Sequence, residues 1–83
     1  MEVTEIEQLI NDALTLDELQ VKFDGSQCSV VAVADMFGDL SRVKRQQVVF
    51  AALADAIKDG RIHAVTVKTF TTAQWQRDKL FNM

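Results

Sequence analysis

The sequence has little of the chemistry that self-contained metal sites and disulfide frameworks need. Its 83 residues include one cysteine, Cys28, and one histidine, His63. A single cysteine excludes an internal disulfide and a CxxC redox pair, and it fits a reducing compartment. One thiol and one imidazole cannot complete a four-ligand metal site. Any metal bound here therefore needs ligands from a second molecule, and the sequence points to a partner.

Other absences narrow the class of protein. The chain has no glycine-rich phosphate loop and no cysteine-rich metal motif, and no third group can be placed to orient Cys28 and His63 as a catalytic pair. The first residues lack the basic start and apolar run of a signal peptide, and no apolar stretch approaches the length of a membrane span. We expect a cytoplasmic protein without enzymatic activity and without contact with a membrane.

Charge is divided unevenly along the chain. Residues 1–40 contain nine carboxylates and one lysine, which gives −8, whereas residues 41–83 contain eight cations and three carboxylates, which gives +5. Such a chain can present a basic face to an anion. Its net charge of −3 nevertheless argues against strong non-specific binding to nucleic acid.

Two helices are indicated by capping residues and apolar spacing. Thr4 and Glu7 have the spacing of a capping box, and the apolar residues after them predict a helix over 4–14. Ser41 is a suitable cap for a second helix, which Gly60 ends. The buried stripe of this second helix is predicted to be Val43, Phe50, Leu53, Ala54 and Ile57.

Three strands are indicated by alternation and by β-branched residues. Residues 19–23 alternate apolar with polar, and the turn Asp24-Gly25 separates them from an apolar run over 28–34. These two strands are expected to form a hairpin. Residues 62–67 are rich in β-branched side chains and predict a third strand, which includes His63.

A short last helix completes a single domain over residues 1–83. Thr71 and Gln74 form another capping box and open a helix that carries Trp75. The order is αββαβα. Because a helix connects the second and third strands, these two are expected to pair in parallel, which gives an α+β fold with one three-stranded mixed sheet packed against helices.

A basic group begins the second helix. Arg42, Lys44 and Arg45 occupy its first turn, where the helix dipole already favours negative charge, so each cation costs a few tenths of a kcal/mol. One interpretation is that the group meets an acidic partner, a phosphate or a carboxylate. The other is that Asp35 and Asp39 neutralise it on a solvated face.

His63 and Cys28 each have a structural and a functional interpretation. His63 shares strand parity with Val65 and Val67, so it is either a residue at the rim of the core-facing row or a metal ligand. Cys28 shares parity with Val30 and is either a buried inert thiol or a second ligand.

Several motifs, in order and spacing, resemble the BolA family, and within it the bacterial IbaG (YrbA) branch. They are Phe37-Gly38, the segment SRVKRQ over 41–46, the segment RIHAV over 61–65, and Thr71 followed by Gln74 and Trp75. The resemblance covers nearly the whole chain. The last motif departs from the family, which usually has glutamate where this chain has Gln74. The resemblance implies a fold similar to class II KH domains, without their GxxG loop.

The family implies a function that suits the incomplete ligand set. Its members are non-enzymatic partners of monothiol glutaredoxins with a CGFS motif, and together they hold a 2Fe–2S cluster in iron–sulfur trafficking, iron homeostasis and stress response. The glutaredoxin and glutathione supply thiolates, and the histidine of the Arg-Ile-His motif, here Arg61 to His63, supplies an imidazole. The oligomeric state without cluster stays open between monomer and homodimer.

The second ligand and a second function also follow from the resemblance. Family members place a histidine or cysteine between the first two strands, where this chain has Gln27, with Cys28 one residue later; Cys28 is our candidate, through a bulge, or else His63 is the only ligand from this chain. The alternative function is a transcriptional regulator that contacts DNA phosphates through Arg42, Lys44 and Arg45.

Overall fold

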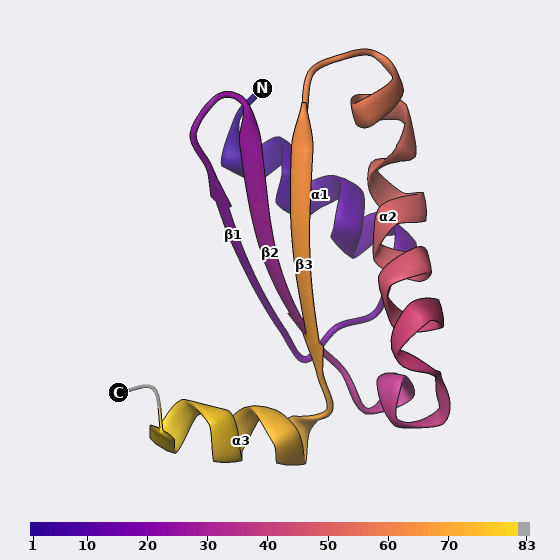
Figure 1. The fold of residues 1–83 in the computed structure, drawn as a ribbon, viewed down its shortest axis with the longest axis vertical. Helices are drawn as coiled ribbons and strands as arrows, with labels where there is room; N and C mark the ends of the chain where they lie inside the picture. The colour runs from indigo at the N-terminus through magenta and orange to yellow at the C-terminus, as the bar shows by residue number, and fades with distance from the viewer. Residues whose placement is uncertain (82–83) are drawn as a thin grey trace.

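The computed structural model describes residues 1–81, and the side chains of residues 1–78, as three helices and a three-stranded sheet in the order αββαβα (Figure 1). The predicted order is confirmed. A short 3₁₀ turn that the sequence did not predict, η1, precedes the second long helix. The elements are α1 (Val3–Ala13), β1 (Glu18–Phe23), β2 (Gln27–Val33), η1 (Asp35–Asp39), α2 (Arg42–Lys58), β3 (Ala64–Phe70) and α3 (Thr72–Phe81).

The sheet is mixed, as expected, with the order β1-β2-β3. β1 pairs antiparallel with β2 from Glu18 opposite Val33 to Phe23 opposite Cys28, and β2 pairs in parallel with β3. Both registers advance residue by residue without interruption, so the bulge considered at Cys28 is not present. The regular pairing fixes which face of the sheet each side chain occupies.

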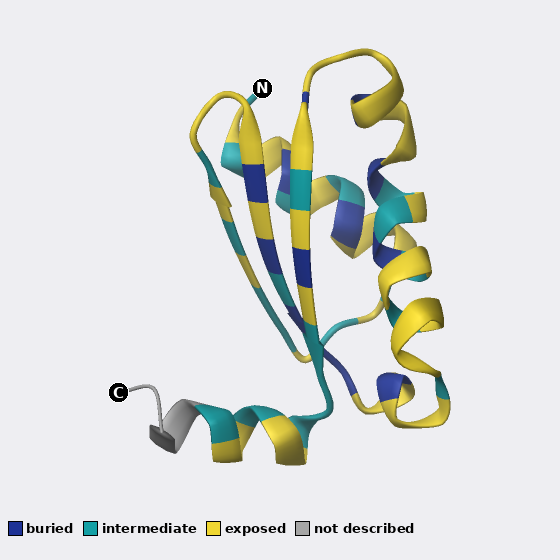
Figure 2. Cartoon of the chain, in the orientation of Figure 1, coloured by how far each residue is buried: buried dark blue, intermediate teal, exposed yellow. Residues whose placement is uncertain are grey.

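The hydrophobic core lies between one face of the sheet and the helices α1 and α2 (Figures 1 and 2). Alternate residues of β2 point into it, and the side chain of Phe37 from η1 is fully buried there. The opposite face of the sheet carries mostly polar side chains. The members of this core cluster that are at most 1% exposed are Ile6, Ile10, Cys28, Val30, Ala32, Phe37, Val49, Leu53, Ala56 and Ile62.

The predicted start of α1 is wrong by one residue. The helix begins at Val3, and its capping box is formed by Glu2 and Glu5, with the Glu2 backbone N–H donating to Glu5 Oε1 at 3.0 Å. Thr4 therefore lies inside the helix. Met1, which precedes this capping box, packs partly buried against the core.

The predicted buried stripe of α2 is wrong at three of its five positions, because the helix is rotated from the expected orientation. Leu53 is buried and Phe50 packs partly buried against the core, both as predicted. Val43 is instead 64% exposed, Ile57 is 37% exposed, and Ala54 is exposed. The residues that face the core with Leu53 are Val49 and Ala56. Apolar residues lie around more than half of the circumference of this helix, so the spacing of apolar residues does not by itself identify the buried face.

Both ends of α2 are closed by the predicted residues. Ser41 Oγ accepts a hydrogen bond from the Lys44 backbone N–H at 3.2 Å. At the other end Gly60 has φ +77°, its N–H donates to the Ile57 carbonyl at 3.1 Å, and the Arg61 N–H donates to the Ala56 carbonyl at 3.0 Å. This is a Schellman motif, and it directs the chain from α2 towards His63.

Gly60→Ala is expected to lower the free energy of unfolding by about 1 kcal/mol, because an L side chain is strained at this positive φ. Urea unfolding followed by circular dichroism measures it. Gly38→Ala is the matched control: its φ is not positive, and an added Cβ would meet Thr71 Cγ2 at 3.5 Å, an ordinary contact. Equal losses in the two variants would contradict the argument.

Candidate functional site

His63 is exposed and lies immediately before β3, whereas the sequence predicted it inside a strand over 62–67. The strand begins later because Arg61 and Ile62 still donate their N–H groups to the Ala56 carbonyl at the end of α2. Ile62 is buried, and the next residue emerges at the surface. The histidine is therefore at the rim of the sheet, with its side chain open to solvent.

The backbone of His63 is attached to the turn between β1 and β2. The His63 N–H donates to the Ser26 carbonyl at 2.9 Å, and the Ala64 N–H donates to the same oxygen at 3.3 Å. Gln27 pairs with Ala64 at the start of the parallel register. Residues far apart in the sequence are thus brought together, and the loop where the family resemblance expects a second ligand lies beside His63.

Asp24 fixes the shape of this turn. Its Oδ1 accepts hydrogen bonds from the N–H groups of Ser26 at 2.9 Å and Gln27 at 2.7 Å, while Gly25 adopts φ +98°. These two hydrogen bonds stabilise the carboxylate and lower the pKa of Asp24 below its ordinary value of 3.8. Their contribution is present above that ordinary value and is lost as pH falls through the lower folded one, so the turn persists in mild acid.

Cys28 lies in the core row of β2 and is 1% exposed. Burial raises the pKa of its thiol, which disfavours the thiolate that a metal ligand must be. The register places Cys28 opposite Val65, and the exposed residue beside it, Gln27, carries an amide. Cys28 as the second ligand stays a prediction, and its burial in this conformation opposes it.

Thiol chemistry tests the burial of Cys28. We expect a neutral aromatic disulfide reagent to modify the native protein at least about a hundredfold more slowly than the urea-unfolded chain, because both access and thiolate formation require opening of the core. The release of the coloured thiol measures both rates. Equal rates in the two states would show that Cys28 is accessible and would return it to the ligand set.

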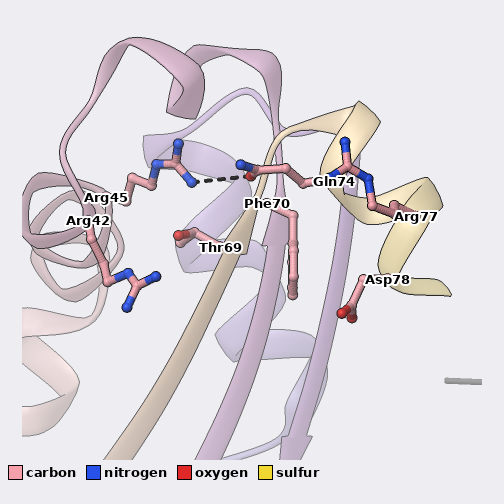
Figure 3. Close-up of a pocket in the computed structure, with 7 residues that line it drawn as sticks. All are labelled: Arg42, Arg45, Thr69, Phe70, Gln74, Arg77 and Asp78. Atoms are coloured by element: carbon pink, nitrogen blue, oxygen red, sulfur yellow. Dashed lines mark hydrogen bonds between the residues drawn. The ribbon is translucent and has the colours of Figure 1, made fainter. Parts of the chain in front are cut away.

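The basic group lies at the opposite end of the molecule from His63. Arg42 and Arg45 begin α2 and line a groove of about 320 Å³ at the end of β3 (Figure 3). Lys44, in the same turn, is exposed and does not line the groove. Because His63 precedes β3 and the groove adjoins Phe70 at its end, strand geometry separates the two by roughly 20 Å.

Asp35 was suggested to neutralise the basic group, but its hydrogen bonds are to Thr72 instead. Its Oδ1 accepts hydrogen bonds from the N–H and the hydroxyl of Thr72, so it attaches η1 to the start of α3, and these contacts lower the pKa of Asp35. A third arginine, Arg77 of α3, completes the groove, and the sequence did not predict it. The sequence did contain one signal for Arg77: it lies three residues after Gln74 of the capping box, and residues at this spacing share one face of a helix.

The predicted site residues therefore divide into two groups. Arg61 belongs with His63, at the end of the sheet where Arg61 Nη2 forms an ion pair with Asp59 Oδ2 at 3.2 Å. Arg42, Lys44 and Arg45 lie at the other end.

Two kinds of site are not found within the residues that the structure describes. No three histidine, cysteine or acidic side chains lie close enough together to bind a metal ion. None of the described helices is long and apolar enough to span a membrane.

Comparison with known proteins identifies relatives of the whole chain. The family model described as BolA-like protein matches residues 10–74. The acid stress protein IbaG of Escherichia coli K12 is 46% identical over 82 residues, which cover 99% of this chain and 98% of the relative. Among solved structures, a Bol-like protein from Babesia bovis superposes with a TM-score of 0.80 at 22% identity, over 95% of this chain and 94% of the other. The BolA domain of SufE1 from Arabidopsis thaliana superposes with a TM-score of 0.75 at 26% identity, over 84% of this chain and 91% of the other.

Proposed function

Because the chain belongs to the BolA-like protein family, we propose that it is a non-enzymatic adaptor that binds a monothiol glutaredoxin with a CGFS motif and shares a 2Fe–2S cluster with it through His63. The observation that carries this proposal is an exposed imidazole on a backbone held by the β1–β2 turn. The proposed location is the cytoplasm. For the oligomeric state without a cluster, we propose either a monomer or a homodimer.

The donor set fits a shared cluster. His63 offers one imidazole nitrogen at the surface, where a partner's ligands can reach the same metal. The glutaredoxin and glutathione would supply the thiolates that this chain lacks. When bound, the cluster would supply iron–sulfur cargo or one-electron redox chemistry. We keep Cys28 as the proposed second ligand of this chain; the alternative is that His63 is the only ligand that this chain provides.

The surroundings of His63 support the proposal by reducing the entropy lost on binding. The hydrogen bond to Ser26 and the Schellman motif at Gly60 fix the backbone on both sides of the histidine. Only the side-chain rotamer remains to be selected when the partner arrives. Arg61, whose ion pair with Asp59 is exposed, is placed to contact the partner at its rim.

Anaerobic cluster reconstitution tests the function itself. The chain is mixed with its host's CGFS glutaredoxin, glutathione, iron and sulfide, and is separated by size-exclusion chromatography with absorbance recorded at visible wavelengths. We expect a heterodimer that carries two iron atoms per complex. Recovery of the cluster only on glutaredoxin homodimers, with this chain eluting alone, would contradict the proposal.

A role in acid stress follows from the ligand and is supported by the name of the Escherichia coli relative. An imidazolium has no lone pair for iron, so we expect the shared cluster to be lost faster as pH falls. The decay of visible absorbance over a pH series measures it. His63→Cys is the control, because a bound thiolate should make the decay less dependent on pH; identical pH profiles would contradict this role.

The alternative function is DNA binding by a transcriptional regulator. It is favoured by the exposure of Arg42 and Lys44 at an end of the molecule that the proposed cluster does not use. Three cations on an acidic domain support only weak, salt-sensitive binding. Simultaneous replacement of Arg42, Lys44 and Arg45 by alanine should weaken DNA binding and flatten its salt dependence. Unchanged affinity and salt slope would exclude this function.

A further inference from the structure

The groove at the end of β3 is large enough for a small molecule. Its volume is about 320 Å³, at the lower end of the range for ligand pockets. Its walls come from the first turn of α2 and from α3, and its floor is formed by Thr69 and Phe70 (Figure 3). Phe70 is supported by Trp75, whose ring centroid lies 5.3 Å away at an interplanar angle of 50°.

Three arginines from two helices line this groove (Figure 3). Arg42 and Arg45 come from α2 and Arg77 from α3, and among the described residues that line the groove Asp78 carries the one carboxylate. The formal charge of these lining residues is therefore +2. Like charges line one groove here although the whole chain carries −3, and an anion in the groove would be attracted by all three arginines.

Arg45 is positioned without being neutralised. Its Nε donates to the Leu40 carbonyl at 3.2 Å, and its Nη1 donates to Gln74 Oε1 at 3.3 Å, and both acceptors are uncharged. The same Gln74 oxygen accepts the Thr71 N–H at 3.0 Å in the capping box of α3. A glutamate here would preserve the cap and cancel the charge of Arg45, whereas glutamine preserves the cap and leaves the charge available.

We propose that this groove binds a phosphate monoester, with its phosphate on Arg42, Arg45 and Arg77 and any planar group it carries stacked on Phe70. A monoester near −2 matches the charge of the lining, and its terminal oxygens suit the forked donors of several arginines better than the single carboxylate of a peptide side chain does. The Thr69 hydroxyl provides one further donor at the floor. The site is separate from the proposed cluster end and does not depend on the proposed function.

Binding is tested on the isolated, ¹⁵N-labelled chain by NMR titration with adenosine 5′-monophosphate, glycerol phosphate and inorganic phosphate. We expect saturable shifts confined to residues around the groove, such as Thr69, Phe70 and Gln74, with the adenosine compound binding tightest. Equal affinity for all three probes would support a phosphate site and remove the stacking on Phe70. Absence of saturable shifts at the groove with every probe would overturn the proposal.

Two substitutions that add the same charge to α3 make the test specific. Gln74→Glu should weaken binding at least about tenfold while preserving the capping box, because it neutralises Arg45. Gln76→Glu, an exposed position that does not line the groove, should weaken it far less. Arg77→Gln provides a second variant should Gln74→Glu alter the fold.

Equal losses from Gln74→Glu and Gln76→Glu would show only long-range charge and would overturn the site. A single-stranded oligonucleotide that binds far more tightly than the monoester, with shifts along the whole of α2, would assign the arginines to nucleic acid and would also overturn it.

Discussion

Replacing His63 with alanine is expected to abolish the visible circular dichroism of the cluster shared with a CGFS glutaredoxin while leaving the fold unchanged. The side chain is exposed, and the hydrogen bond that anchors this residue uses the backbone N–H, which alanine retains. Loss of one ligand from a cluster site exposes iron to solvent and to exchange, so we expect at least about a tenfold loss of cluster occupancy in the heterodimer.

Gln46→Ala is the matched control for this variant. Gln46 is another exposed polar residue, and it lies in the first half of α2, towards the end of the molecule away from His63. Its cluster spectrum should equal that of the unmodified chain. A His63→Ala complex with unchanged spectrum and iron content would show that the imidazole is not a ligand. Loss of the far-ultraviolet signal would instead indicate unfolding, which the exposure of His63 argues against.

Leu53→Ala is expected to lower the free energy of unfolding by about 3 kcal/mol. Replacing a buried leucine with alanine leaves a cavity and typically costs about 2–5 kcal/mol. Leu53 is 0% exposed and packs from α2 into the core. A domain of this size has roughly 5–15 kcal/mol of stability in total, so this one substitution removes a large part of it. Urea unfolding at equilibrium measures the loss.

Ile57→Ala separates the observed orientation of α2 from the one that the sequence predicted. Leu53 and Ile57 both belonged to the predicted buried stripe, but Ile57 is 37% exposed. Replacing its side chain with alanine should therefore lower the free energy of unfolding by less than about 1.5 kcal/mol. Similar losses at Leu53 and Ile57 would place both on the buried face and contradict the orientation described here.

Local patterns predicted the elements well because each rests on a few neighbouring residues. Ser41 and the pair Thr71 and Gln74 cap helices as expected, with hydrogen bonds that require only a spacing of three residues. The hairpin follows from alternation and from a turn that needs Gly25 at positive φ. These features were confirmed because no distant part of the chain competes with them.

The arrangement of the site could not be predicted in the same way. The sequence suggested a binding role for the basic group at Arg42 to Arg45 and another for His63, and the parallel strand β3 separates the two to opposite ends of the sheet. Arg77 was missed because its place beside the groove depends on how α3 leaves the sheet. The exposed fraction of Cys28 likewise depends on α1 and α2 covering its face.

Two ends of one small sheet thus have different chemistry. The end near residue 63 offers one imidazole nitrogen beside a turn held by hydrogen bonds, and the end near residue 70 offers three arginines around an aromatic floor. A partner at one end leaves the other accessible, unless its contact surface spans the length of β3. Whether phosphate monoesters alter cluster binding can therefore be tested with both ligands present.

The most direct test of the account is ligand identification by pulsed electron paramagnetic resonance. The chain is produced with ¹⁵N-labelled histidine, assembled with unlabelled glutaredoxin and glutathione, and its cluster is reduced. His63 is the only histidine of this chain, so any strong ¹⁵N coupling to the cluster can come only from its imidazole. We predict that coupling. A reduced cluster in the heterodimer without ¹⁵N coupling would contradict ligation by His63 and, with it, the proposed function.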